Sequence, residues 1–135
     1  MPAASRHMNV FRRCVEADDS AVLLTRCLQP GRGATGEFLL LLTNRRLVVT
    51  RQSRVLHRLS LHLNANLRHL SHVTWAADRD GAGFEVSATA VDGVRERFWT
   101  NLGDRDRVHH VEAMFERVFT GLSAARLQQL EAVAA

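Results

Sequence analysis

Arginine side chains are concentrated in a stretch of the sequence that lacks acidic residues. Residues 38–77 contain no aspartate or glutamate. A guanidinium can pair two N–H groups with two oxygens of one phosphate, so arginines without acidic neighbours are suited to anion binding. The candidate anion- or partner-binding residues are Arg45, Arg46, Arg51, Arg54 and Arg58. The alternative is that these arginines are only the solvent-exposed residues on the outer faces of strands.

The charge is unevenly distributed along the 135 residues. Residues 1–72 contain 11 arginines and 4 acidic residues, whereas residues 73–135 contain 7 arginines and 10 acidic residues. All 18 basic residues are arginine, and the net charge is +4. One side of the fold is therefore expected to present a positive field to an anionic partner.

Histidines and acidic residues form no familiar catalytic or metal-binding motif. The sequence has no HExxH, no nucleophile elbow and no phosphate-binding loop. His69 and His72 would point to opposite faces of a strand, so they could share a metal only within a helical turn. The adjacent His109 and His110 diverge on a helix, and the loop from Asp78 lacks the glutamate that completes a calcium site. We therefore predict a protein without catalytic activity, cofactor or metal.

An apolar hairpin is the strongest structural signal. Residues 37–43 (EFLLLLT) and 46–52 (RLVVTRQ) flank Asn44 and Arg45, and asparagine tolerates the positive φ of a tight turn. The sequence predicts an antiparallel pair with a two-residue turn. In this register Leu42 faces Leu47, Leu40 faces Val49 and Leu41 faces Val48.

Both faces of this hairpin are apolar near its middle, unlike a sheet that is wet on one side. One face belongs to the core. The other face carries Leu39, Leu41 and Val48, and it needs a cover. The cover is either a helix of the same chain or a second subunit, and a second subunit would make the protein a dimer or larger.

Five more strands are predicted, at 21–28, 55–61, 67–77, 84–90 and 94–100. The last two are expected to flank a three-residue loop, 91–93, with Gly93 at positive φ. This register pairs Val86 with Phe98 and leaves Glu96 as an awkward inward residue. It gathers an inner set of Phe84, Val86, Ala88, Val94 and Phe98, and it turns Arg95, Arg97 and Trp99 outward.

Helices are predicted at both ends of the chain. A short one is expected within 9–18, and a longer one starts after the N-cap Asp104. Gly121 is expected to interrupt the longer helix, and Ser123 to cap a second segment. The chain is thus divided into a leader with a short helix (1–19), a domain (20–120) and an additional helical segment (121–135).

The stretch Gly36-Glu-Phe-Leu-Leu-Leu-Leu-Thr-Asn-Arg-Arg-Leu-Val-Val resembles the hairpin of bacterial pleckstrin-homology (PH) and GRAM-type domains. The resemblance covers about residues 20–120. It implies an α+β, mainly β fold: a PH-like barrel of seven antiparallel strands in two sheets, capped by a C-terminal helix, here with a short N-terminal helix. Phosphoinositide-binding members carry basic residues on their first two strands. Residues 36–43 carry none, and only Arg26 and Arg32 lie nearby, so the resemblance does not extend to a phosphoinositide site.

Such domains are binding modules for lipids, peptides or like subunits. We rank protein interaction or self-assembly as a homo-oligomer first, because the doubly apolar hairpin and the extra helix both need cover. Peripheral binding to anionic phospholipids through the arginines is second. Nucleic-acid binding is third, because only Trp75 and Trp99 supplement six phenylalanines for base stacking. The N-terminus lacks a signal-peptide core, so a cytoplasmic protein is expected, with attachment to the membrane surface under the second reading.

Overall fold

The strands form two antiparallel sheets that are consecutive in the chain. The computed structural model describes all residues except 1, 31–36, 54–57, 79–80 and 135, and it leaves the side chains of 2–6 and 121–134 undescribed. Sheet A has the order β1-β2-β3-β4, and sheet B has the order β5-β6-β7. The strands of sheet A are β1 (Ala21–Cys27), β2 (Glu37–Thr43), β3 (Arg46–Gln52) and β4 (Leu59–Asn66). Those of sheet B are β5 (Ser71–Ala77), β6 (Gly83–Thr89) and β7 (Arg95–Asn101).

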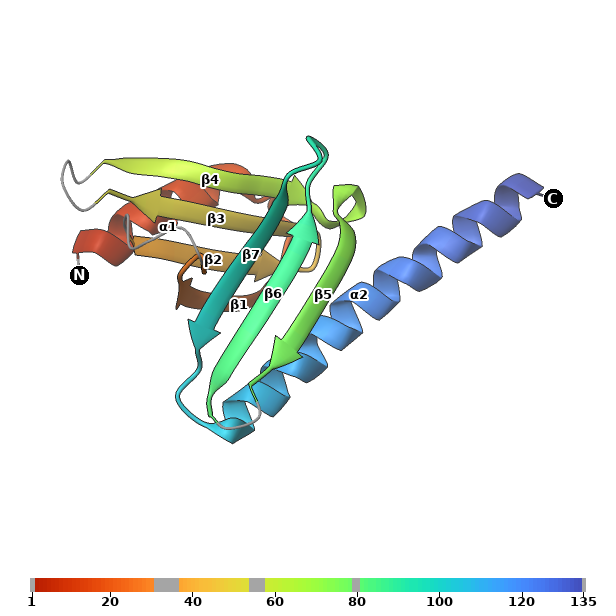
Figure 1. Cartoon of the computed structure of the whole chain (residues 1–135). Coiled ribbons are helices and arrows are strands. Elements are labelled where there is room, and N and C mark those ends of the chain that lie inside the picture. Colours follow the sequence, from red (N-terminus) through yellow and green to blue (C-terminus); the bar gives the residue numbers. More distant parts are fainter. Residues whose placement is uncertain (1, 31–36, 54–57, 79–80, 135) are drawn as a thin grey trace.

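Sheet B crosses sheet A at a steep angle, and helices flank the pair (Figure 1). Helix α1 (Pro2–Cys14) precedes sheet A, and helix α2 (Arg105–Ala134) follows sheet B. At one corner the backbones of Leu28 and Trp99 exchange two hydrogen bonds of 2.9 and 2.8 Å. The fold is therefore mainly β and has two sheets, as predicted, but its described strands do not close into the expected barrel.

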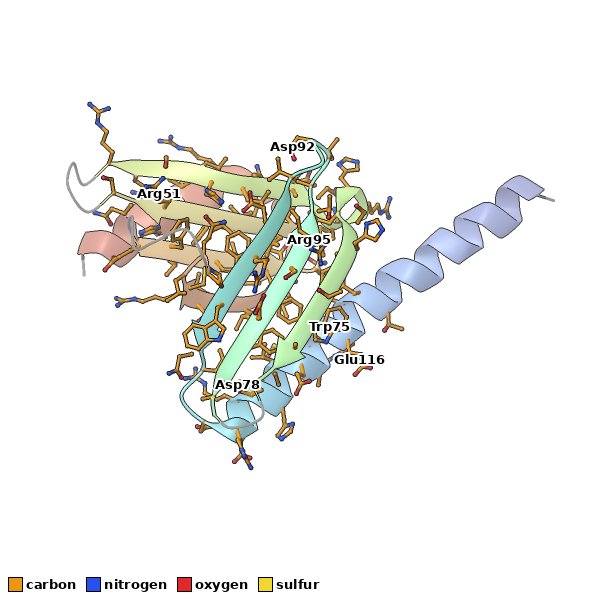
Figure 2. The ribbon with its side chains drawn as sticks, in the orientation of Figure 1. Arg51, Trp75, Asp78, Asp92, Arg95 and Glu116 are labelled. Atoms are coloured by element: carbon orange, nitrogen blue, oxygen red, sulfur yellow. The ribbon has the colours of Figure 1, made fainter. Side chains whose placement is uncertain are left out.

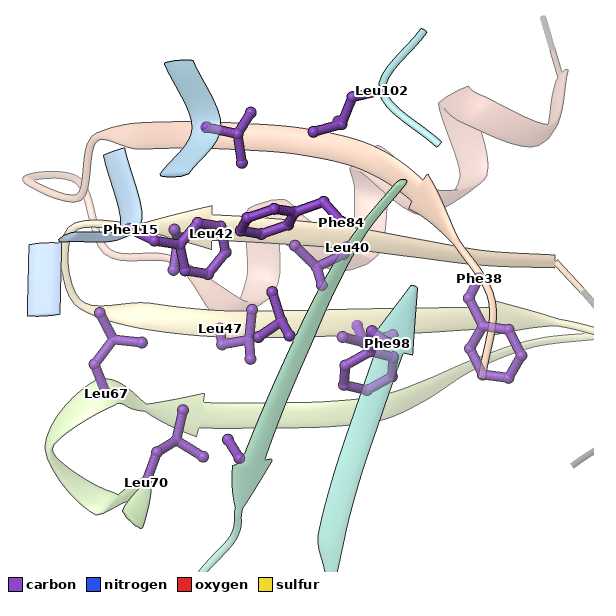
Figure 3. Packing of buried hydrophobic residues seen from close by; sticks show 14 of the residues in the cluster. Phe38, Leu40, Leu42, Leu47, Leu67, Leu70, Phe84, Phe98, Leu102 and Phe115 are labelled. Carbon is purple, nitrogen blue, oxygen red and sulfur yellow. The ribbon is translucent and has the colours of Figure 1, made fainter. Parts of the chain in front are cut away.

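The main core lies between the inner faces of the two sheets and the first half of α2 (Figure 3). Successive side chains alternate between the two faces along β2, β3 and β6, so one apolar row from each strand points into this space. Phe84 and Phe115 are almost fully buried, and their ring centroids lie 5.2 Å apart. The helix thereby seals one open side of the sandwich.

The β2–β3 hairpin has the predicted register: Leu42 pairs with Leu47, Leu40 with Val49 and Leu41 with Val48. Its turn, however, does not use a positive φ at Asn44. Instead, the hydroxyl of Thr43 accepts the backbone N–H groups of Arg45 and Arg46 at 3.1 and 2.8 Å. Side-chain capping of the turn thus replaces the left-handed backbone that the sequence suggested.

The β6–β7 hairpin also confirms its predicted register. Val86 pairs with Phe98, which is 3% exposed, and Gly93 has a φ of 83°. Val94 is the exception among the predicted inner residues, because it is 42% exposed. It lies beside the turn, at the tip of the hairpin, where the sequence pattern alone cannot show that the core has ended.

The boundaries of β4 and β5 differ from the prediction. The strand expected at 55–61 occupies 59–66, and residues 54–57 lie outside the described residues. The strand expected at 67–77 begins with a 3₁₀ turn, η1 (Leu67–His69), because the side chain of Asn66 accepts the backbone N–H of Arg68 and starts a new turn. Leu67 and Leu70 are both buried, so the turn still contributes to the core.

Both helices are longer than predicted. Helix α1 begins at Pro2 rather than near residue 9, and α2 runs unbroken through Gly121. One glycine costs a helix only about 1 kcal/mol relative to alanine, which does not suffice to end it. Asp104 caps α2 as expected, since its Oδ1 accepts the N–H of Arg107 at 2.8 Å.

The left-handed conformation of Gly93 gives a prediction for stability. No atom lies within 4 Å of a Cβ added at Gly93, so Gly93→Ala should cost only backbone strain, about 1–2 kcal/mol. Gly81→Ala is the matched control, because Gly81 lacks a positive φ and its new Cβ would meet Asp78 at an ordinary 3.8 Å. Urea unfolding of both variants measures the difference, and equal losses would contradict the prediction.

Candidate functional site

The side chain of Arg45 is engaged by carboxylates from the segment after α1. Its guanidinium lies 2.7 Å from Asp18, 3.5 Å from Glu16 and 3.6 Å from Asp19. The same turn is also held by its neighbour, since Asn44 exchanges two hydrogen bonds with the backbone of Ser20. Arg45 therefore ties the α1–β1 connection to the β2–β3 turn. The sequence missed this because the three acids lie more than 25 residues away.

The other predicted arginines do not share one surface with Arg45. Arg46 and Arg51 lie on opposite faces of β3, because they are five positions apart and successive side chains of a strand alternate between its faces. The Nη1 of Arg46 donates a 3.4 Å hydrogen bond to Oδ1 of Asn64. Toward the other end of the strand, the guanidinium carbon of Arg51 lies 5.9 Å from the centroid of the Phe38 ring (Figure 2). Arg58 is exposed just before β4, and Arg54 lies outside the described residues. The structure thus distributes the described members over both faces and both ends of sheet A.

Helix α1 covers the outer apolar face of the hairpin. Leu41 and Val48 are buried with Phe11 in a second cluster, against which Leu39, Met8, Cys14 and Val15 pack. Of the two covers that the sequence left open, the structure shows the helix of the same chain. Self-assembly therefore does not need this face, and the predicted face of Leu39, Leu41 and Val48 serves as the docking site of α1.

A buried histidine lies beneath α1. His7 is 2% exposed, and its Nδ1 is hydrogen-bonded to the hydroxyl of the fully buried Thr50 on β3. Burial lowers the pKa of His7 below its ordinary 6.5, and the charge of Arg26 also lowers it, against opposing effects of Glu37 and Gln52. The docked helix therefore favours a neutral imidazole.

Glu96, which the predicted register places inward among apolar residues, has two polar partners between the sheets. Its Oε2 accepts a 2.6 Å hydrogen bond from Gln29 Nε2 and lies 3.2 Å from His62 Nε2. The His62 ring stands edge-on to Phe38 and Phe98, with centroids at 5.4 and 5.9 Å. This cluster joins β4 and β7 across the sandwich. Within the described residues, no three His, Cys, Asp or Glu side chains gather as a metal site, and His69 and His72 lie in η1 and β5 respectively.

Helix α2 has a packed half and a projecting half. Val108, Val111 and Phe115 are buried on the sheets, and Trp75 of β5 stacks on Phe119 at 5.6 Å. Beyond this point the helix continues to Ala134 and extends past the sheets (Figure 1). The sequence pattern predicted a break at Gly121 rather than a single continuous helix. A helical pattern unbroken by proline from Arg105 to Ala134 was the available signal.

Comparison with known protein families and with curated proteins finds no match to this chain. Within the described part of the chain, no helix is both long and apolar enough to cross a membrane.

Removing the Arg45 side chain should loosen the α1–β1 connection. Because the pairs are partly exposed, we expect Arg45→Gln to lower the free energy of unfolding by about 0.5–1 kcal/mol, and less in high salt. Arg58→Gln, at an exposed position, should leave stability unchanged. Urea unfolding at low and high sodium chloride measures both, and a salt-independent loss for Arg45→Gln would contradict the ionic explanation.

The buried imidazole of His7 predicts acid sensitivity. The unfolded chain binds a proton near pH 6.5, whereas the docked helix resists it, so this contribution to stability is complete above pH 6.5 and is lost as the pH falls below it. His7→Gln keeps a hydrogen-bonding side chain without this titration. The Tm of the wild type should therefore fall more steeply than that of His7→Gln between pH 7.5 and 5, and parallel curves would refute the role of His7.

Proposed function

We propose that the protein is a non-catalytic interaction module that self-associates through the projecting half of α2. The observation that carries this proposal is the length of the helix. At 30 residues α2 measures about 45 Å, whereas β5, beside which it packs, has seven residues and measures about 24 Å. Roughly half of the helix therefore has no sheet to pack on.

The projecting half of α2 begins beside a cluster of three aromatic rings. Phe115 is buried, whereas Phe119 and Trp75 are only half-buried, and the three rings contact one another at centroid distances of 5.6–6.0 Å. Partly exposed apolar side chains therefore lie at the edge of the domain, where α2 extends past the sheet. A partner helix placed along α2 would continue this surface.

The sequence of the projecting half supports a helical partner. It contains Leu122, Leu127, Leu130 and Val133 among alanines, and only Arg126 and Glu131 are charged. Isolated helices of this length are marginal in water, so packing against a partner would stabilise it. A second copy supplies the same segment with one charge of each sign, which favours an antiparallel pair in which Arg126 of one copy meets Glu131 of the other.

The alternative, peripheral attachment to anionic phospholipids through the predicted arginines, has less support. Arg45 already has carboxylate partners, and Arg46 and Arg51 lie on opposite faces of β3. An anionic surface could not engage this set together.

For the fold itself, we propose a PH-like arrangement that is not closed into a barrel. The order of seven strands in sheets of four and three, followed by a helix that seals the open side, supports it. The apolar hairpin at residues 36–49 supports it from the sequence.

Sedimentation velocity of the full chain at micromolar concentrations tests the proposed self-association. We expect a dimer, and we expect Leu127→Glu with Leu130→Glu to weaken it by at least about tenfold, because buried charge at a helix interface is costly. Gln128→Glu with Gln129→Glu adds the same charge at adjacent positions and should weaken the dimer less.

A wild-type chain that sediments as a monomer would refute self-association. Equal weakening by both double variants would show that net charge, rather than an apolar seam, governs assembly. Circular dichroism at each step confirms that the helix content of the variants is retained.

A further inference from the structure

The outer face of sheet B is polar and is not covered by either helix. Its residues include Thr74 on β5, Ser87 and Thr89 on β6, and Arg95 and Arg97 on β7, which the strand registers place in adjacent rows. Arg95 lies on this face in Figure 2, and its side chain is exposed. The surface is thus accessible to a ligand in the folded chain.

The two arginines of this face differ in their partners. The Nε of Arg97 donates a 2.7 Å hydrogen bond to Glu85, so a carboxylate balances its charge. No carboxylate among the described residues lies within ion-pair distance of Arg95. Two acids lie within three residues of Arg95 in the chain. Glu96 points to the opposite face, where it pairs with Gln29, and Asp92 lies in the turn of the β6–β7 hairpin, where its Oδ1 accepts the N–H of Val94.

Three neutral oxygens hold the Arg95 guanidinium in place. Its Nη1 donates to the carbonyl of His72 at 2.9 Å and to the hydroxyl of Thr89 at 3.1 Å, and its Nη2 donates to the hydroxyl of Thr74 at 3.2 Å. These bonds use three of the five guanidinium N–H groups. The Nε–H and one Nη2 hydrogen remain, and this pair is a fork that matches two oxygens of one anion.

The two hydroxyls add further donors. A threonine oxygen that accepts from a guanidinium still carries its own hydrogen. Thr74 and Thr89 therefore each present an O–H group within one hydrogen-bond length of Arg95. Up to four donors converge at this point, with a positive charge and without a carboxylate partner among the described residues.

The backbone at His72 is arranged so that its carbonyl reaches Arg95. His72 has a φ of 50°, and it is the only non-glycine residue with positive φ in the described part of the chain. It lies in an irregularity of the β5–β6 pairing between Ser71 and Thr74. A left-handed conformation is unfavourable for such a residue, and conformations of this kind concentrate at functional sites.

We propose that Arg95, Thr74 and Thr89 form a binding site for a phosphate group, with the carbonyl of His72 as the positioning group. A tetrahedral oxyanion has enough acceptors to use the fork and both hydroxyls at once. The group could belong to a free phosphate compound or to a lipid headgroup, because both present the same oxygens. The site is independent of the predicted arginines of residues 45–58 and of the projecting half of α2.

Titration of inorganic phosphate into the ¹⁵N-labelled full chain at constant ionic strength tests the proposal. The Nε–Hε signal of Arg95 should shift and saturate, and the signal of Arg97 should move little. Arg95→Lys keeps the charge but loses the fork, and we expect it to bind phosphate about tenfold more weakly. Arg97→Gln is the matched control from the same face and should change binding less than about twofold.

Thr74→Val is a second variant that should retain the fold, because valine is well tolerated on an exposed strand. It removes one hydroxyl, and we expect about threefold weaker phosphate binding. No shift of Arg95 on addition of phosphate would overturn the proposal. Equal weakening by Arg97→Gln and Arg95→Lys would also overturn it, because it would reduce the effect to general charge.

Vesicles distinguish the two sources of the phosphate group. Phosphatidic acid in phosphatidylcholine presents a phosphate monoester, and phosphatidylglycerol at equal charge presents only a diester. Binding to the first that is stronger than to the second, and that is lost in Arg95→Lys, assigns the site to a lipid headgroup. A response to inorganic phosphate without vesicle binding assigns it to a free phosphate compound. Vesicle binding that Arg95→Lys does not weaken, together with an unmoved Arg95 signal, would refute both.

Discussion

Both faces of the β2–β3 hairpin are buried, so each face needs other elements of the chain packed against it. Leu40, Leu42, Leu47 and Val49 require a sheet and a helix on one side, and Leu41 and Val48 require a cover on the other. Sheet B with the first half of α2 meets the first requirement, and α1 meets the second. At about 25 cal/mol per Å² of apolar surface, leaving either side in water would remove several kcal/mol from a domain whose net stability is of that order.

Sequence patterns predicted the parts of this arrangement that depend on neighbouring residues. The registers of both hairpins followed from the rule that a one-residue slip exchanges the faces of a strand. The cap of α2 at Asp104 followed from its side chain. The predictions for the start of β4, for the segment at Leu67 and for a break in α2 were wrong. A capping asparagine and a glycine inside a helix are weak local signals, and packing decides the outcome.

Contacts between distant segments could not be predicted from the sequence. Three sets of contacts join residues from different strands or loops. They are the ion pairs of Arg45, the hydrogen bonds of Glu96 with Gln29 and His62, and the hydrogen bonds of Arg95. The arginine-rich stretch is visible in the sequence as a run of residues. Whether it forms one surface depends on strand direction, however, and alternation along β3 separates its members.

The position of α1 has a consequence for the order of folding. His7 and Thr50 are 43 residues apart, whereas the hairpin beneath them closes through a two-residue turn. Contacts so distant in sequence carry a large loop-closure cost, and they form after local ones. During synthesis α1 leaves the ribosome before sheet A does, and its docking surface is incomplete until β4 has emerged. We therefore expect α1 to be among the last elements of this fold to reach its native place.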